Sequence, residues 1–337
     1  MVAPRDLLTD LVDTPSVSGA EDEAAALLVD AFEAADREVY RDDVGNVRAP
    51  ADDSVLLTSH IDTVPGDIPV RVEDGTLWGR GAVDAKGPLA TMAVAALETG
   101  VSFAGVVEEE TTSHGARHLV ETRETPGAVV NGEPGGWARV VLGYRGYHAG
   151  TYRLEVPGAH TARGVPNAIE RAMDWWTDVG KAVESDAETA FERIAAKPVG
   201  FDGGVTADGL ATAATVDAQF RLPPGTSGDD VEAAVEYVTD DGSLEWGEPI
   251  PPVMCSPRND VARSFRAAIR ANDGEPTHVR KTGTSDMNLY ADAWDVPMAT
   301  YGPGDSSLDH APDERLDLEE FDRAVAVLTE AASDLAE

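Results

Sequence analysis

Imidazole and carboxylate side chains follow three strand-like segments near the start of the chain. VLLTSHID ends on His60 and Asp62, FAGVVEEE ends on three glutamates at 108–110, and VVNGEP carries Glu133. Zinc and similar cations prefer imidazole nitrogen and carboxylate oxygen, and catalytic sites hold them with few protein ligands so that water keeps a position. The types and positions of these residues therefore predict a metal-dependent active site.

Two further segments offer ligands of the same kind. Asp84 lies in the glycine-rich loop GRGAVDAKG, ahead of a helix-like run, and His310 lies far downstream in SSLDHAPDE. Asp84 follows His60 by 24 residues, and Glu133 follows Glu110 by 23 residues. Because each interval is close to the length of a strand-plus-helix unit, each unit is expected to deliver one ligand to the same edge of a sheet.

Each of these patterns also has a structural interpretation when it is taken alone. Side chains two apart on a strand point to one face, so Asp62 can hydrogen-bond the far nitrogen of His60, but such a pair also occurs without a metal. Asp84 alone is an ordinary loop acid. The three glutamates repel one another unless a cation or a proton offsets them, or else they form a solvated strand end. The joint pattern favours the metal site.

Length and composition limit the class of protein. The 337 residues predict two domains, and a hydrophobic content of 42% favours a globular fold. Cys255 is the only cysteine, which excludes an intrachain disulfide and a thiolate zinc cluster. No apolar run reaches the length of a bilayer-spanning helix, and the first residues lack the pattern of a signal peptide. We therefore expect a cytoplasmic protein without a membrane partner.

The formal net charge of −36 is extreme, and acidic residues occur throughout the chain. A negative surface disfavours nucleic acid as a partner, because phosphate binding relies on clustered Lys and Arg. Near molar salt the screening length falls to about 3 Å, which offsets the self-repulsion that otherwise opposes compaction. The charge therefore predicts a halophilic protein in a salt-rich cytosol. The alternative is that the acidity recruits a basic partner.

Residues 1–147 alternate helix-like and strand-like stretches. A helix is expected from Ser18, its cap, because acids fill the first turn and apolar residues recur at helical spacing. The β-rich runs that follow are 55–59, 103–107, 128–130 and 140–142. This rhythm predicts an α/β fold with a mostly parallel sheet flanked by helices. Ligands of such sheets collect at the carboxyl ends of the strands, where the candidate metal ligands lie.

The pattern changes after residue 147. The stretches then follow the order strand, helix, strand, strand, helix, strand, which is typical of a small α+β ferredoxin-like unit. We expect this unit, residues 148–253, to be inserted into the first domain. The first domain would then comprise residues 1–147 and 254–337, and it would end with two more helices.

Seven segments, taken in order, resemble a known family. They are SHIDTVP, GRGAVDAKG, EEETTSHGA, NGEP, GAHTARGVPNAIE, KTGTSDMN and YGPGDSSLDHAPDERLDL. They resemble the co-catalytic zinc hydrolases that include aminoacylases, glutamate-releasing carboxypeptidases and diaminopimelate desuccinylases. Within that family, GRGAVDAKGP is most similar to the carrier-protein-linked lysine/ornithine hydrolases of archaeal lysine and arginine synthesis. The resemblance implies a zinc-exopeptidase-like catalytic domain, an inserted dimerisation (lid) domain and hence a homodimer.

The resemblance also assigns roles to the strand-end cluster. It implies two Zn²⁺ or Co²⁺ ions per subunit with these ligands: His60 and Glu133 on one metal, Glu110 and His310 on the other, and Asp84 bridging both. Glu109 becomes the general base. From its position beside His60, Asp62 is also predicted to be a catalytic residue. Glu108 stands where many relatives have Asp, and Thr112 stands where many have Gly.

Residues outside the cluster are candidates for substrate contact. The resemblance makes His160 of GAHTARG an oxyanion donor that reaches into the neighbouring subunit's site, although alone it would be a surface histidine. Arg258 is a candidate for gripping the free carboxylate of the released amino acid, because a guanidinium fork matches that group. Its alternative is a solvated arginine at a helix start. Lys281, Gly283 and Thr284 form a loop that can line the same pocket.

The predicted activity is hydrolysis of an amide bond. The resemblance implies release of lysine or ornithine from a small acidic amino-group carrier protein whose terminal glutamate side chain is bonded to the amino acid's α-amino group. Two alternatives stay open. One is an N-acyl amino acid deacylase, dipeptidase or carboxypeptidase of the same family, and the other is a non-catalytic relative that binds the carrier. The presence of every matched ligand and of the base disfavours the second.

Overall fold

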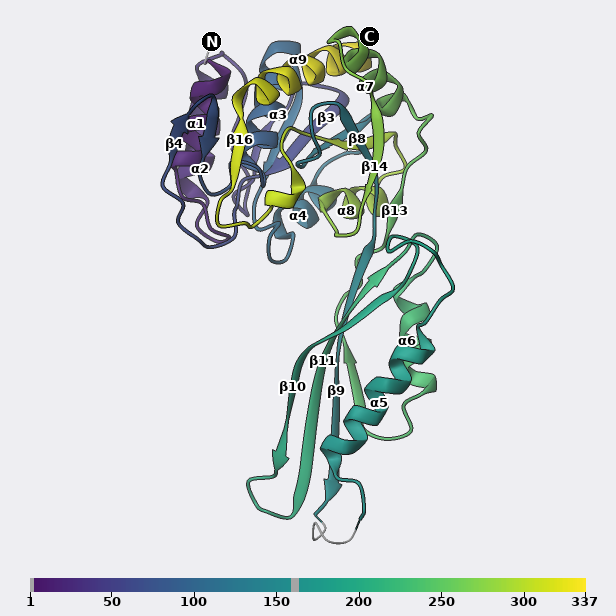
Figure 1. Cartoon of the computed structure of the whole chain (residues 1–337). Helices are drawn as coiled ribbons and strands as arrows, with labels where there is room; N and C mark the ends of the chain where they lie inside the picture. The colour runs from purple at the N-terminus through teal and green to yellow at the C-terminus, as the bar shows by residue number, and fades with distance from the viewer. Residues whose placement is uncertain (1–2, 159–163) are drawn as a thin grey trace. The chain divides into compact units, whose positions relative to one another are not determined.

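The computed structural model describes residues 3–158 and 164–337, which form two compact units (Figure 1). Unit 1 comprises Met1–Gly143, Cys255–Arg280 and Ser285–Glu337, and unit 2 comprises Tyr144–Met254 and Lys281–Thr284. Unit 2 thus begins four residues before the expected boundary and includes a short segment that was expected in the catalytic domain. Unit 2 begins earlier than expected because its opening strand starts at Gly146, inside the motif GYRGYHAG.

The main sheet of unit 1 is parallel at its centre. Its strands are β1 (Tyr40–Arg41), β2 (Val47–Ala49), β3 (Asp52–His60), β6 (Val101–Val106), β7 (Val129–Gly132), β8 (Arg139–Tyr144), β14 (Thr277–Lys281) and β15 (Met298–Tyr301). They follow the order β1-β2-β6-β3-β7-β15-β8, and β14 also pairs with β8. The neighbours β6, β3, β7 and β15 run parallel, whereas β2 and β8 join antiparallel. The predicted α/β fold with a mostly parallel sheet is confirmed.

Helices cover both faces of this sheet (Figure 1). One face carries α1 (Pro4–Asp13), α2 (Asp22–Glu33), α3 (Lys86–Thr99), α7 (Asp260–Ala271) and α9 (Leu318–Leu335). The other face contacts α4 (His114–Thr122) and α8 (Asp286–Ala293). Phe32 of α2 stacks on Phe103 of β6 with ring centroids 5.0 Å apart, and the hydroxyls of Tyr290 and Thr58 lie 3.2 Å apart on the opposite face. The helix α3 is buried from Lys86 to Ala96, as its apolar residues on every side require.

The start of α2 differs from the prediction. This helix begins at Asp22 with Glu21 as its N-cap residue, and Ser18 is not its cap. The Ser18 hydroxyl instead donates to Oδ2 of Asp62 at 2.7 Å. Gly19 follows with a φ of 83°, a left-handed conformation that glycine adopts without steric cost. The left-handed conformation of Gly19 interrupts the chain between Ser18 and Asp22, so the helix starts after it.

A small antiparallel sheet holds the segment after His310 in place. Its strands are β4 (Arg71–Glu73), β5 (Thr76–Trp78) and β16 (Arg315–Asp317). The order is β16-β5-β4, with Arg315 paired to Trp78. These strands of three residues were not predicted, because they are too short to show an alternating pattern. The Asp74–Gly75 pair at the β4–β5 turn was the available signal, since Asp-Gly favours a tight hairpin.

Unit 2 has the predicted order strand, helix, strand, strand, helix, strand. Its elements are β9 (Gly146–Pro157), α5 (Ala168–Ala182), β10 (Ala195–Val205), β11 (Ala211–Leu222), α6 (Gly228–Tyr237) and β12 (Ser243–Trp246), and β13 (Val253–Met254) follows at its end. The antiparallel sheet has the order β10-β11-β9-β12. Both helices pack on it around buried aromatic residues, of which Tyr152 and Trp175 stack with centroids 3.9 Å apart.

In residues 3–158 and 164–337, none of the helices is both long enough and apolar enough to cross a membrane.

Candidate metal centre

The carboxyl ends of three parallel strands bring the cluster residues to one edge of the main sheet. His60 is the last residue of β3, Glu133 follows β7 directly, and Glu110 lies four residues after β6. The strand register is level at this edge, because His60 pairs with Val106 of β6 and Ser59 pairs with Gly132 of β7. The side chains that follow these strands are therefore held close together by the sheet itself.

Asp84 lies between two imidazoles. Its Oδ1 is 3.2 Å from Nε2 of His60, and its Oδ2 is 3.2 Å from Nε2 of His310. Each imidazole has a second carboxylate nearby: Glu133 Oε1 is 3.9 Å from His60 Nε2, and Glu110 Oε2 is 3.0 Å from His310 Nε2. The cluster consequently contains two sets of three donors that share the Asp84 carboxylate.

The donors have the chemistry and the spacing of a metal site. Ligands at about 2.0–2.1 Å in tetrahedral geometry around zinc lie about 3.3 Å from one another. The contacts of Asp84 with both imidazoles are close to this value. Ligand atoms of His60, Asp84 and Glu110 also lie within 4.8 Å of one another. The residues present therefore fit two cations bridged by one carboxylate.

The acids of the cluster lie in a strongly negative environment. Burial raises the pKa of Glu109 well above its ordinary value, and the nearby carboxylates of Asp286, Glu133 and Glu110 raise it further. Burial also raises the pKa of Glu110, and the charge of Asp84 adds to this effect. Carboxylates crowded in this way hold protons or bind a cation.

The imidazoles respond to the same negative field. Burial lowers the pKa of His60, but hydrogen bonding to Asp62 and Asp84 outweighs it, so the pKa lies well above the usual value. The hydrogen bond with Asp84 raises the pKa of His310 to about 9, although partial burial opposes the shift. The potential at both imidazole nitrogens therefore favours positive charge, as expected where cations bind.

Asp62 supports the cluster through hydrogen bonds to the backbone. Its carboxylate is fully buried and accepts hydrogen bonds from the backbone N–H groups of Glu109 at 3.0 Å and Glu110 at 3.1 Å. Nδ1 of His60 lies 3.0 Å from the backbone oxygen of Asp62 and 3.4 Å from its Oδ1. The backbone carbonyl is thus the nearer partner of the imidazole, while the carboxylate holds the loop that carries Glu109 and Glu110.

Four candidate substrate residues are described by the structure, and they lie outside this cluster. His160 falls outside the described residues. Arg258 is an exposed residue of unit 1 in the turn before α7, where its backbone N–H donates to Oγ of Ser256 at 3.2 Å. Lys281, Gly283 and Thr284 belong to unit 2, in which Oγ1 of Thr284 accepts a hydrogen bond from Arg221 at 3.2 Å.

Some supporting residues were missed in the sequence. Oδ1 of Asn46 accepts from the Val107 N–H at 3.1 Å, and its Nδ2 donates to the Gly115 oxygen at 3.0 Å, so it braces both ends of the acidic loop. Oε1 of Glu21 accepts from the Glu108 N–H at 3.2 Å. Glu314 accepts from the N–H of Asp84 at 3.0 Å. Of these residues, only Glu314 could have been suspected from the sequence, because it lies in the segment that carries His310.

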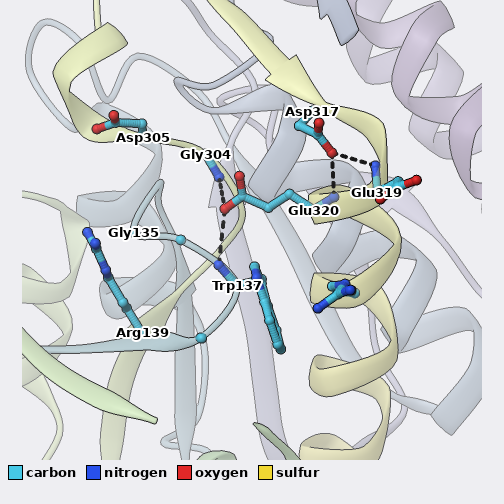
Figure 2. A pocket seen from close by; sticks show the side chains of 11 residues that line it. Gly135, Trp137, Arg139, Gly304, Asp305, Asp317, Glu319 and Glu320 are labelled. Atoms are coloured by element: carbon cyan, nitrogen blue, oxygen red, sulfur yellow. Dashed lines mark hydrogen bonds between the residues drawn. The ribbon is translucent and has the colours of Figure 1, made fainter. Parts of the chain in front are cut away.

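A cavity of about 490 Å³ lies beside the first turn of α9 (Figure 2). Oε1 of Glu320 accepts hydrogen bonds there from the N–H groups of Trp137 at 3.2 Å and Gly304 at 3.1 Å. Asp317 caps α9 by accepting from the N–H groups of Glu319 and Glu320. These carboxylates serve as loop and helix supports, so the strand-end cluster remains the candidate metal centre.

Comparison with known families supports this assignment. The sequence profile of Peptidase family M20/M25/M40 matches residues 56–334. The chain is similar to the [LysW]-lysine hydrolase of Deinococcus radiodurans, with 40% identity over 99% of this chain and 97% of the relative. It is also similar to a putative [LysW]-lysine/[LysW]-ornithine hydrolase of Thermococcus kodakarensis, with 36% identity over 98% of this chain and 91% of the relative.

Solved structures share the fold. A metallo-carboxypeptidase of the M20 family from Sulfolobus solfataricus superposes with a TM-score of 0.80 at 17% identity and covers 100% of both chains. A dinuclear metal-binding peptidase of the M20 family from Bacillus subtilis gives a TM-score of 0.71 at 14% identity and covers 99% of this chain and 96% of its own. The architecture of both units is thus found in these structures.

Proposed function

The chain belongs to peptidase family M20/M25/M40, and on that premise we propose that it is a metal-dependent hydrolase that releases lysine or ornithine from a small carrier protein. The observation that carries the proposal is the Asp84 carboxylate, whose two oxygens each lie 3.2 Å from a different imidazole. This arrangement suits a carboxylate that bridges two cations.

We assign the ligands by their positions around Asp84. His60 and Glu133 would hold one metal, Glu110 and His310 would hold the other, and Asp84 would be shared between them. The donor set is compatible with zinc and with cobalt, because imidazole and carboxylate ligands do not discriminate sharply between them. Cations held by these residues would supply Lewis-acid chemistry, which is polarisation of the scissile carbonyl and a lowered pKa of a water.

The remaining residues orient groups and move protons. Glu109 takes a proton from the attacking water and returns it to the amine of the released amino acid, since a carboxyl with a raised pKa suits both tasks. Asp62 keeps Glu109 in place through its backbone N–H. We further propose that His160 stabilises the developing oxyanion from a neighbouring subunit, and that Arg258, with Lys281, Gly283 and Thr284, binds the amino acid.

The substrate proposal rests on the relatives. Proteins named as hydrolases of [LysW]-lysine or of both [LysW]-lysine and [LysW]-ornithine match nearly the whole chain at 36–40% identity. The bond to be cleaved is the amide between the terminal glutamate side chain of the carrier and the α-amino group of lysine or ornithine. The enzyme would then complete the carrier-linked synthesis of lysine or arginine in the cytoplasm.

We also propose a homodimer that forms through unit 2. The strand β10 lies at the edge of its sheet, and Val199, Phe201 and Val205 on this strand are 57%, 43% and 71% exposed. Exposed sheet edges with apolar side chains favour pairing with a second chain. A dimer of this kind would bring a second copy of unit 2 into the assembly, as the role proposed for His160 requires.

One assay tests the proposed substrate. The purified protein, loaded with zinc or cobalt in high salt, is incubated with carrier-linked lysine, carrier-linked ornithine and acetyl-ornithine, and the free amino acid is measured. We expect release from at least one carrier conjugate, and loss of that release in a chelator-treated sample until metal is restored. Turnover of acetyl-ornithine alone would show instead an N-acyl amino acid deacylase.

A further inference from the structure

Glu314 is a buried charged residue four positions after His310, immediately before β16. Its side chain is fully buried and accepts three hydrogen bonds. Oε1 accepts from the backbone N–H groups of Val83 at 2.9 Å and Asp84 at 3.0 Å, and Oε2 accepts from Nη1 of Arg80 at 2.7 Å. Burying a carboxylate costs much free energy unless it is paired and hydrogen-bonded, and Glu314 meets both conditions.

We propose that Glu314 is a positioning residue that fixes the backbone of Asp84 and thereby aims its carboxylate at both imidazoles. The inference rests on the proposed dinuclear site. Glu314 acts on the cluster through the backbone N–H of Asp84. Arg80 is the charged partner of Glu314, because its guanidinium offsets the charge of the buried carboxylate.

The loop that carries Asp84 needs such a support. Residues 79–85 form consecutive turns between β5 and α3, outside any sheet ladder. Within this loop the N–H of Ala82 bonds to Gly79 and the N–H of Lys86 bonds to Gly81, whereas the N–H groups of Val83 and Asp84 bond to Glu314. A backbone N–H that loses its partner inside a protein is destabilising, so the loop would shift without Glu314.

The same residue connects the loop to the segment of His310. The backbone oxygen of Glu314 accepts from the N–H of Gly79 at 3.3 Å, and the next residue, Arg315, pairs with Trp78 of β5. The side chain and the backbone of Glu314 therefore bind opposite ends of one loop. Asp84 and His310, which approach to 3.2 Å, are held by one continuous set of contacts.

Asp62 provides a parallel within the same site. It is likewise fully buried, and its carboxylate accepts from two successive backbone N–H groups, those of Glu109 and Glu110. Two ligand-bearing loops are thus each held by a buried carboxylate that reaches backbone N–H groups. This repetition favours a role in aligning ligands over a purely local contribution to packing.

Metal binding measured in Glu314 variants tests the proposal. The affinity of the two metal equivalents is determined by competition with a chelating dye, without substrate. Loss of a partner behind a ligand typically weakens metal affinity about 10–100-fold. We expect about a 10-fold loss in Glu314→Gln, which keeps an acceptor oxygen but not the charge, and about a 100-fold loss in Glu314→Ala. Arg80→Lys, which keeps a positive charge, should fall between the wild type and Glu314→Gln.

Glu320→Gln is the matched control. Glu320 also accepts from two backbone N–H groups, those of Trp137 and Gly304, but neither belongs to a proposed ligand (Figure 2). This variant should bind metal as the wild type does, even if urea unfolding shows a similar loss of stability. If Glu314→Ala does not fold, Glu314→Gln and Arg80→Lys carry the test.

Wild-type metal affinity in both Glu314 variants, with only their stability reduced, would overturn the inference and leave the proposed function intact. A wild-type protein that fails to bind two metal ions would contradict the proposed function itself. The two failures are therefore distinguishable in one set of titrations.

Discussion

The surroundings of Glu109 differ from those of an ordinary surface glutamate. Its pKa is raised by burial and by three carboxylates, and its backbone N–H is held by Asp62. A raised pKa makes this carboxyl a better proton acceptor and donor than an ordinary glutamate, as a general acid and base requires. The two glutamates beside it in the sequence have other surroundings. Glu110 contacts His310, and Glu108 has a left-handed backbone conformation with a φ of 57°.

The change Glu109→Gln should lower kcat by about 10²–10⁴-fold, the usual contribution of a general acid and base. The amide has nearly the same shape but cannot take a proton from water. Metal content, measured by atomic emission, should stay at the wild-type value because Glu109 is not a proposed ligand. Glu108→Gln is the neighbouring control and should keep most of the activity. A Glu109→Gln enzyme within about tenfold of wild-type kcat would reject the assignment of the base.

The candidate ligands could be proposed from the sequence, whereas the residues that support them could not. His60, Asp84 and Glu133 are recognisable because imidazole and carboxylate groups recur at the ends of strand-plus-helix units. Asn46 and Glu314 act through hydrogen bonds to distant backbone groups, and such contacts depend on the folded path of the chain. A single sequence shows neither the partner nor the burial that makes these residues matter.

At the scale of elements, long periodic segments were predictable and short or irregular ones were not. The helices α5 and α9 follow strong apolar periodicity and begin at capping residues, Asn167 and Asp317. The residues of β10 are hard to assign from the sequence, because AAKPVGFDGGV contains glycine and proline and lacks alternation. Its place at the sheet edge tolerates Pro198, since an edge strand needs fewer backbone donors.

The parallel strands are the elements that make the site. Their carboxyl ends lie level because β3 pairs in parallel with β6 on one side and β7 on the other. The small sheet of β4, β5 and β16 then holds the segment after His310 beside the loop of Asp84. This second sheet explains how a residue 200 positions from Glu110 reaches it at 3.0 Å.

At the scale of the whole molecule, the formal charge of −36 is the dominant property. Many of its acidic side chains are exposed, so they repel one another across the surface. The screening length is about 10 Å at 0.1 M salt and about 3 Å at 1 M, and the repulsion weakens accordingly. We therefore propose that the folded state requires a salt-rich environment.

We expect the midpoint of thermal unfolding to rise steeply as KCl increases from about 0.1 M to about 1 M, the range over which screening becomes short. Circular dichroism at fixed pH measures this midpoint. Sucrose at matched osmolarity is the control, because it is excluded from protein surfaces without screening charge. An unfolding midpoint that is equal in low and high KCl would contradict the halophilic interpretation.

The number of metal ions bound per chain tests the central claim most directly. The protein is saturated with zinc or cobalt in high salt and dialysed. Its metal content is then measured by elemental mass spectrometry and divided by the protein concentration. The arrangement of two imidazoles around Asp84 predicts about two ions per chain in the wild type, as in other two-metal sites, and fewer in Asp84→Ala. A wild-type protein that binds one ion or none, or an Asp84→Ala variant that still binds both, would contradict the account.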